Sequence, residues 1–188
     1  DYSFKRIGST LDDAVGEAYD KVAKVLGLEY PGGPKIDKLA AIGNDTYNLP
    51  YPLDDDSYNF SFSGIKSAVI NLVHNETQRN NEIVKENMAA SFQNRVVTVI
   101  TKKTKRALEE YKVKHLVMAG GVAANSGLRK SIENMCNDLN VSFSTPPIKY
   151  CTDNGAMIGA AAYYAYKAGI IADLKLNAKA TDSLYEIK

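Results

Sequence analysis

The sequence predicts a helix-rich α/β fold, and three observations support this class. The stretch HLVMAGGVAANSG, residues 115–127, is an apolar strand followed by two glycines and a polar residue where a helix begins. Apolar residues recur at helical spacing on both sides of it. A second short strand over 141–145 and a helix of small residues over 153–168 come next. This βαβα order is typical of parallel strands joined by right-handed crossovers, with ligands at the strands' carboxyl ends.

Residues 1–111 are predicted to hold an opening strand and a helical region. The opening strand is expected over 2–10. A helix follows and ends near Gly27. Its apolar stripe consists of Val15, Ala18, Val22, Val25 and Leu26. Pro34 is expected as the first residue of a short helix over 34–43, because its missing N–H costs little at that position.

Residues 44–60 carry two prolines and an acidic run, which indicates a surface loop. Two further helices are predicted after this loop, the second continuing towards Tyr111. The first has one apolar face made of Ile65, Ala68, Val69, Leu72 and Val73. The second has a face made of Val84, Met88, Phe92, Val96 and Ile100. The βαβα segment then occupies 112–168, and 169–188 form a tail.

The composition sets limits on the protein class. A chain of 188 residues, 45% of them apolar, can bury one good core as one domain or two small ones. The net charge of +1 provides no general attraction to nucleic acid. Cys136 and Cys151 have no metal-ligand spacing and are expected to be ordinary thiols in a reducing compartment. No run is long enough to span a bilayer and no signal peptide is evident, so we expect a cytoplasmic protein without membrane association.

The glycine turn after the first predicted strand is a candidate nucleotide site. Gly120 and Gly121 permit positive φ and remove Cβ atoms that would keep a ligand from the backbone. Free N–H groups at the start of the next helix favour a phosphate or ribose, and Asn125 could bind a ribose or base. A tight turn without a ligand explains the same residues equally well.

An acidic stripe on the first helix is a second candidate. Asp13, Glu17 and Asp20 share one face and could bind ribose hydroxyls or a cation, although a solvated acidic face is the more common explanation. Gly16 lies inside this helix, where glycine costs about 1 kcal/mol relative to alanine. Its presence favours close approach of another backbone or a ligand.

The stretch YPGGP and the helix after it are a third candidate. Exposed N–H groups near Gly33, with Asp37 one turn further on, could meet a sugar or phosphate. A stiff Pro-Gly turn is the favoured alternative.

Asp153 precedes a helix whose first turns have almost no side-chain bulk, so it could point into a gap between that helix and a ligand. The favoured alternative is that Asp153 or Thr152 is only the helix N-cap. A metal site needs further ligands, and His74 and His115 have no metal-binding spacing. Both histidines are expected to be structural or surface residues.

A basic cluster lies on the long predicted helix and consists of Lys102, Lys103, Lys105 and Arg106. Such a cluster could contact RNA phosphates. A solvated face is favoured, because Glu109 and Glu110 offset much of its charge.

Four segments together resemble one family: LDDAVGEAYDKVAKVLGLEYPGGPKIDKLA, FSFSGIKSAV, AGGVAANSGLR and YCTDNGAMIGAAA. In this order and at these separations, they are similar to the C-terminal part of the TsaD family, formerly labelled O-sialoglycoprotein endopeptidases or glycoproteases. The resemblance extends from about Ile7 to Tyr166. It implies an actin-like ATPase domain of the sugar kinase and heat-shock-protein type. The chain would be the C-terminal part of this two-lobed fold, without the N-terminal lobe.

The resemblance implies transfer of a threonylcarbamoyl group from threonylcarbamoyl-AMP to the exocyclic amine of the adenosine 3′ of the anticodon in tRNA. It assigns substrate contacts to Asp20, Gly33, Asp37 and Asn125, with Gly120 and Gly121 forming one wall of the site. It assigns Asp153 to a divalent metal, iron or zinc. TsaB-like and TsaE-like proteins are the implied partners. No residue stands out as the general base, so no catalytic residue is assigned.

The sequence departs from the family pattern in one respect. The family's HxxxH metal ligands and glycine-rich loop belong to an N-terminal half and do not occur here. We therefore expect this chain alone to bind no metal tightly and to have little or no transferase activity. Two alternatives stay open: an ATP-dependent phosphotransferase or ATPase on the same fold, and a catalytically silent partner-binding module. Neither a Ser/His/Asp set nor a zinc-protease motif supports proteolysis.

Overall fold

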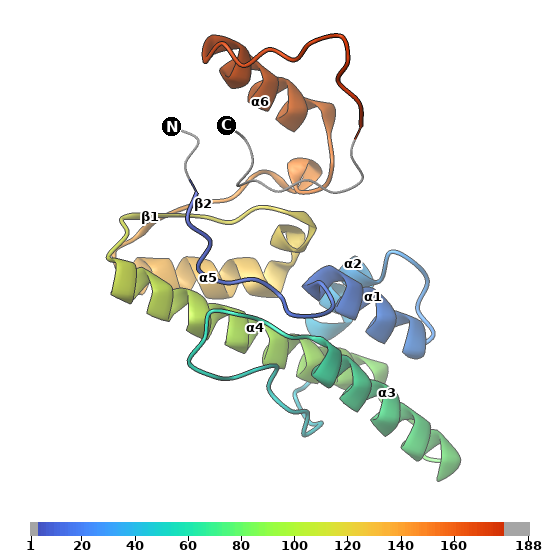
Figure 1. Cartoon of the computed structure of the whole chain (residues 1–188). Coiled ribbons are helices and arrows are strands. Elements are labelled where there is room, and N and C mark those ends of the chain that lie inside the picture. The colour runs from blue at the N-terminus through green and yellow to red at the C-terminus, as the bar shows by residue number, and fades with distance from the viewer. Residues whose placement is uncertain (1–3, 179–188) are drawn as a thin grey trace.

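The computed structural model describes residues 4–178, which form a helix-rich domain with a small parallel sheet (Figure 1). Helix α5 lies between α4 and the two strands, and α6 stands apart from the other helices. The elements are α1 Val15–Val25, α2 Gly32–Ala40, α3 Ser63–Gln78, α4 Lys85–Tyr111, β1 His115–Val117, the 3-10 turn η1 Gly121–Ala124, α5 Ser126–Asp138, β2 Ser142–Ser144, the 3-10 turn η2 Ile148–Tyr150 and α6 Gly155–Lys167.

The two strands pair in parallel, with His115 opposite Ser142 and Val117 opposite Ser144. Parallel neighbours need a crossover connection, and α5 supplies it. Its buried face packs on this sheet and on α4 and consists of Leu128, Ile132, Met135 and Cys136. The predicted βαβα order is therefore confirmed, with each strand shorter than expected.

The main core lies where α1, α2, α3 and the first half of α4 meet. Tyr19 and Phe92 pack edge to face there, with ring centroids 5.0 Å apart. The apolar stripes predicted for these helices contribute buried side chains, among them Val22, Ile65, Val69, Met88 and Val96. Val84 is the exception, because it is the N-cap of α4 and is 48% exposed.

The predicted opening strand is wrong over the described residues 4–10. Only Thr10 forms an isolated parallel bridge, to Phe60. Main-chain hydrogen bonds join Phe60 to Ser9 and Leu11, so the segment pairs over one short stretch instead of forming a ladder. Residues 1–3 and 179–188 of the predictions lie outside the described residues.

Two predicted helix starts also differ from the structure. Helix α2 begins at Gly32, so Pro34 is its third residue and not its first. Helix α6 begins at Gly155, because the side chain of Asn154 accepts a hydrogen bond from the Met157 N–H and is the N-cap.

The expected loop over 44–60 has no helix and only the bridge at Phe60.

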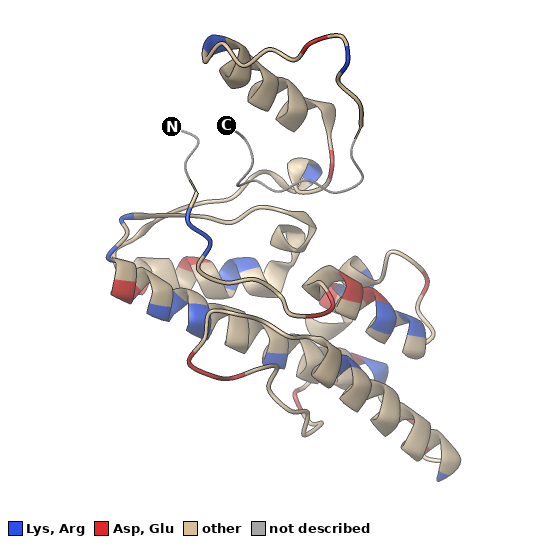
Figure 2. Ribbon diagram, viewed as in Figure 1, with Lys and Arg blue, Asp and Glu red and all other residues tan. Residues whose placement is uncertain are grey.

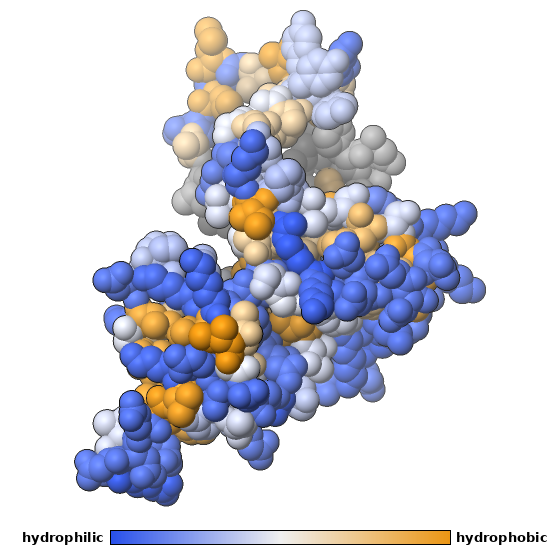
Figure 3. Space-filling view, turned by 180° about the vertical axis from the view of Figure 1, so that it is seen from behind, coloured by the Kyte–Doolittle hydropathy of each residue, from blue (hydrophilic) through white to orange (hydrophobic). Residues whose placement is uncertain are grey.

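Helix α6 buries none of its residues. Apolar side chains consequently remain on the surface of the projecting part of the molecule (Figure 3), including those of Met157, Ile158, Tyr163, Tyr164 and Tyr166. Among residues 4–178, no helix combines the length and the apolar character needed to cross a membrane.

Candidate functional site

A pocket of about 570 Å³ lies at the carboxyl end of β1. Ala119, Gly120 and Gly121 line one side, and the segment from Pro146 through Asp153 to the first turn of α6 lines the other. The volume is in the range of small-molecule sites. The structure thus brings the predicted glycine pair and the predicted metal ligand to one pocket.

The space beside the glycines is not filled by the chain itself. Gly120 has a φ of +92°, which favours glycine. A Cβ atom added to Gly121 or to Gly33 would meet no heavy atom within 4 Å. Internal packing therefore does not require a glycine at Gly33 or Gly121.

Two predicted residues, Asp37 and Asn125, belong to a second group that is joined by hydrogen bonds. We call it the Gln93 cluster: Tyr19, Asp37, Gln93, Asn125 and Ser126. The Gln93 Nε2 group donates to Asp37 Oδ1 at 3.0 Å. The Asn125 Nδ2 group donates to Gln93 Oε1 at 2.7 Å. Asp37 and Asn125, both predicted to contact the substrate, are therefore held by the same side chain.

Two of the first N–H groups of α5 have partners within the chain, contrary to the prediction that they are free. The Ser126 N–H donates to Asp37 Oδ2 at 2.9 Å, and the Leu128 N–H donates to Asn125 Oδ1 at 2.8 Å. These two carboxamide and carboxylate oxygens cap α5, because the first turn of a helix has N–H groups without intrahelical partners. A ligand at this turn would have to use other groups.

Helix α1 begins at Val15, so the predicted acidic stripe on one helix face is wrong for Asp13, which precedes the helix. The three carboxylates also have different partners. Asp13 forms ion pairs with Lys66 at 2.5 Å and Lys21 at 3.3 Å. The Lys66 contact, together with Lys21, holds the pKa of Asp13 below its usual value. Glu17 pairs with Lys21 at 2.5 Å. The stripe is therefore neither a shared cation site nor a simple solvated face.

Asp20 accepts a hydrogen bond from the Gly32 N–H at 2.8 Å and so caps the start of α2 from outside. A side chain at Gly32 would collide with Ala23 and with the Asp20 main chain. The close approach of another backbone predicted from Gly16 is not seen, since a Cβ atom there would meet only the Val122 side chain, at an ordinary contact distance of 3.4 Å. Helix α1 thus lies against both α2 and the η1 turn.

Arg129 connects the η1 turn to the wall of the pocket that contains Pro146 and Cys151. Its guanidinium donates to the main-chain oxygen of Ala123 on one side. On the other side it donates to the Pro146 oxygen at 2.7 Å and to the Cys151 sulfur at 3.2 Å. The planar guanidinium fork suits this multiple contact.

Cys136 and Cys151 are free and buried, and burial raises the pKa of the Cys136 thiol.

Asp153 does not form a metal site with the other described side chains. Between residues 4 and 178, no group of three or more His, Cys, Asp or Glu residues could hold a metal ion. Asp153 is exposed and is not a helix cap, since Asn154 takes that position. His74 and His115 are both exposed. A tightly bound ion normally needs three or four protein ligands, so this donor set does not fit one.

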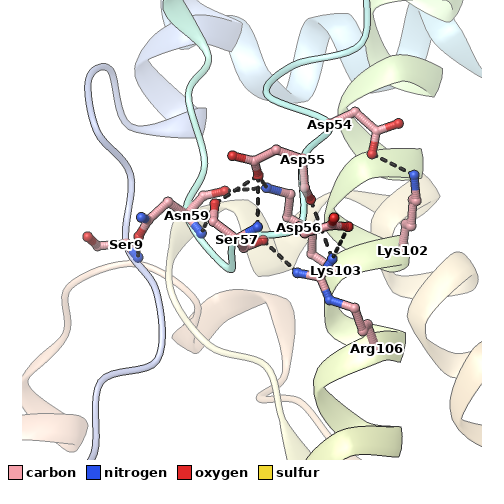
Figure 4. Close-up of polar contacts among 9 residues, drawn as sticks. All are labelled: Ser9, Asp54, Asp55, Asp56, Ser57, Asn59, Lys102, Lys103 and Arg106. Carbon is pink, nitrogen blue, oxygen red and sulfur yellow. Dashed lines mark hydrogen bonds and ion pairs between the residues drawn. The ribbon is translucent and has the colours of Figure 1, made fainter.

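Part of the basic cluster on α4 is covered by the acidic loop before α3 (Figures 2 and 4). Lys103 pairs with Asp55 at 2.7 Å and donates to the Asn59 oxygen, and its side chain is only 1% exposed. Lys102 pairs with Asp54 at 2.7 Å. The expected solvated face is wrong for Lys103, because residues 54–59 fold back onto α4 and neutralise it.

Residues 1–160 match the family model described as TsaD, tRNA N6-adenosine threonylcarbamoyltransferase. The chain belongs to the TsaD family. Among curated TsaD relatives, the tRNA N6-adenosine threonylcarbamoyltransferase of Staphylococcus haemolyticus (strain JCSC1435) is 58% identical over 175 residues, which are 93% of this chain and 51% of the relative. The protein of the same name from Staphylococcus aureus (strain JH9) is 55% identical over 185 residues, 98% of this chain and 54% of the relative. The chain spans about half the length of the curated relatives it matches.

Solved structures share the fold of this TsaD chain. The crystal structure of T. kodakarensis HypF has a TM-score of 0.58 at 20% identity and covers 84% of this chain and 20% of HypF. Full-length HypF in its phosphate- and nucleotide-bound form has a TM-score of 0.56 at 18% identity, covering 82% of this chain and 20% of that one. At these identities the likeness concerns the fold alone.

Sequence reasoning missed the polar residues that organise this part of the TsaD chain. Gln93, Ser126 and Arg129 were assigned no role. Gln93 follows the buried Phe92 in the apolar run of α4, and a glutamine inside such a run was the available signal. Ser126 and Arg129 gave no comparable signal, since both are ordinary residues near a helix start.

Proposed function

We propose that this chain is the C-terminal portion of a two-lobed, actin-like tRNA N6-adenosine threonylcarbamoyltransferase. Membership of the TsaD family and the 55–58% identity to enzymes of that name support the proposal. In this proposal residues 1–111 form the helical region, 112–168 the substrate segment and 169–188 the tail. The other half of the longer protein supplies the remaining part of the site.

The observation that carries the proposal is the arrangement around residues 120–125. Gly120 and Gly121 line the pocket with Asp153, and Asn125 joins Asp37 in the Gln93 cluster at the end of the same turn. We assign the pocket to the phosphate of threonylcarbamoyl-AMP. Asp20, Gly33, Asp37 and Asn125 are assigned to the nucleoside part of the substrate.

The proposed reaction is an acyl transfer. The exocyclic nitrogen of the tRNA adenosine attacks the carbamoyl carbon, a new C–N bond forms, and the bond from that carbon to the phosphate oxygen breaks. AMP leaves with the electron pair, and the amine gives up one proton to a base that is not assigned in this chain. The residues named above bind and orient the adenylate, which lowers the barrier by holding the reacting atoms close together.

The partners and cofactor are proposed on family grounds. We propose that tRNA and TsaB-like and TsaE-like proteins act with the full-length protein. We also propose that Asp153 completes a site for one divalent ion, iron or zinc, when the other ligands come from the rest of the longer protein. The donor set of this chain does not fit such an ion by itself, so no reaction step is assigned to it.

Gly121→Ala in the full-length protein tests the pocket. A methyl group there meets no protein atom, so we expect no loss of folding stability beyond about 0.5 kcal/mol. The methyl group would occupy space that we assign to the adenylate, so the KM for threonylcarbamoyl-AMP is expected to rise about tenfold or more. Threonylcarbamoyl transfer to tRNA and urea unfolding measure the two effects.

Gly64→Ala is the matched control, since its added Cβ atom also meets nothing and it lies on α3. Equal transfer kinetics for the two variants would exclude the pocket as the adenylate site. Wild-type protein that phosphorylates an acceptor with ATP but transfers no threonylcarbamoyl group would favour a phosphotransferase. Wild-type protein without either activity that still forms a stable complex with a partner would favour a silent binding module.

A further inference from the structure

We propose that Gln93 is a positioning residue of the substrate site, which fixes the orientation of Asp37 and Asn125 through the two ends of one amide. This inference rests on the proposed function, because it concerns two of the residues assigned to the nucleoside. Gln93 does not touch the substrate in this proposal. It acts by holding the groups that do.

The hydrogen-bond pattern gives Gln93 two different tasks. Its Nε2 group donates to Asp37 Oδ1 at 3.0 Å, and its Oε1 atom accepts from Asn125 Nδ2 at 2.7 Å. Tyr19 adds a third contact, with its hydroxyl donating to Oε1 at 3.4 Å. A carboxylate partner needs a donor and an amide NH₂ partner needs an acceptor, so one primary amide satisfies both.

The orientation of Asn125 is determined at both ends. Its Oδ1 atom accepts from the Leu128 N–H, so its Nδ2 group must face Gln93. An amide NH₂ group has two N–H donors, and Gln93 accepts one of them. The second N–H is the donor that we assign to the substrate.

Burial makes this arrangement rigid. Gln93 is 8% exposed, as is Asn125, and a buried polar group that loses its partner costs about 1–3 kcal/mol. Glycine at 127 leaves the room that the amide needs, because a Cβ atom there would lie 2.8 Å from Gln93 Nε2. Two separate features, the hydrogen bonds and this space, therefore fit a glutamine at position 93.

Gln93→Glu in the full-length protein tests the proposal. Glutamate keeps the shape but places an acceptor against Asp37, so two carboxylates face one another above the pH at which they share a proton. Asp37 and Tyr19 are the titratable groups that contact Gln93. The pKa of Tyr19 is raised by burial and, to a smaller extent, by the charge of Asp37, so Tyr19 stays protonated.

We expect the KM of Gln93→Glu for threonylcarbamoyl-AMP to exceed the wild-type KM by about tenfold or more near pH 8. As the pH falls and the two carboxylates share a proton, the KM of the variant should approach the wild-type KM. The variant's kcat is expected to change much less than its KM. A merely structural role would lower the amount of folded enzyme without making the KM ratio depend on pH.

Asn94→Asp is the matched control. Asn94 is the next residue on α4, and its amide donates to Asp45 at 2.5 Å, so this variant also creates a carboxylate pair. It lies outside the Gln93 cluster, and its KM is expected to follow that of the wild type at each pH. If both variants shift the KM alike, or neither does, the positioning role of Gln93 is overturned.

Gly127→Ala covers the case in which Gln93→Glu does not fold. The added methyl group crowds the Gln93 amide without removing any hydrogen-bonding group, so we expect a KM increase of about fivefold or more with kcat retained, from displacement of a preorganised group. An unchanged KM would contradict the proposal. Wild-type protein that transfers no threonylcarbamoyl group would instead contradict the proposed function, which keeps the two failures distinct.

Discussion

Three aspartates each accept hydrogen bonds from the start of a helix elsewhere in the sequence. Asp12 accepts from the Phe62 and Ser63 N–H groups at α3, Asp20 from Gly32 at α2, and Asp37 from Ser126 at α5. A carboxylate at a helix N-terminus satisfies unpaired N–H groups and interacts favourably with the helix dipole. At the residue scale, these contacts add specific polar links to the apolar packing between segments that lie far apart in the sequence.

The contact of Asp20 leads to a stability prediction. Asp20→Ala removes the acceptor for the Gly32 N–H, so the free energy of unfolding of the 188-residue chain is expected to fall by about 1 kcal/mol. Asp20→Asn keeps an acceptor oxygen and is expected to lose less than half of that. Urea unfolding measures both. An Asp20→Ala variant with the wild-type free energy of unfolding would show that α2 does not depend on this cap.

At the scale of elements, the loop before α3 serves as a cover for α4. Residues 54–56 bring three carboxylates over the basic side chains of that helix, and Lys103 is buried beneath them (Figure 4). Hydrogen bonds from Lys103, then from Ser57, lower the pKa of Asp55 to about 2. The positive charge of Lys103 is therefore neutralised inside the chain, whereas the side chains of Lys102 and Lys105 stay more than half exposed.

This lowered pKa predicts an acid-dependent loss of stability. The pKa of Asp55 is lower in the folded state than its ordinary value of 3.8. The contribution of its carboxylate to the free energy of unfolding is therefore complete above about pH 4 and is lost as the pH falls towards 2. The difference in unfolding free energy between wild type and Asp55→Asn should therefore shrink over that window. Urea unfolding at a series of pH values measures it.

Asp173→Asn controls for the loss of one acidic charge, since Asp173 lies in the segment after α6 and not against α4. A wild-type minus Asp55→Asn difference that stays constant between about pH 5 and 2.5 would contradict the role of the Lys103 contact.

At the scale of the whole molecule, the chain presents one wall of a proposed site and a helix, α6, that buries none of its residues. Asp153 lies in the pocket wall with no further metal ligands gathered around it in the described part of the chain. Since the curated relatives are about twice as long, the metal and transfer functions are predicted to need the longer protein.

Metal content tests this prediction. After incubation with zinc and gel filtration, the 188-residue chain is expected to retain no stoichiometric zinc, because one carboxylate does not hold the ion. The full-length protein is expected to retain about one ion per chain, and Asp153→Ala to lower that amount. Elemental analysis measures the content. Stoichiometric zinc on the short chain would mean that Asp153 has partners that the predicted ligand set lacks.

The sequence by itself determined the helices, the parallel βαβ unit and the family. Apolar spacing fixes which face of a helix is buried, and a strand, glycine turn and helix are encoded by neighbouring residues. The helices over 65–73 and 84–100 were predicted for this reason. The prediction of an opening strand was wrong because a strand depends on a pairing partner. The local sequence pattern could not reveal that only one short stretch pairs with Phe60.

Only the tertiary structure decided which polar groups meet. Gln93 bonds to Asp37 and to Asn125, which are 56 and 32 residues away in the sequence, and Lys103 bonds to Asp55, 48 residues away. No periodicity encodes such partners, because a hydrogen bond depends on the direction and distance between two groups after the helices have packed. The same packing gave Asp13 and Glu17 lysine partners and placed Asp20 at the start of α2.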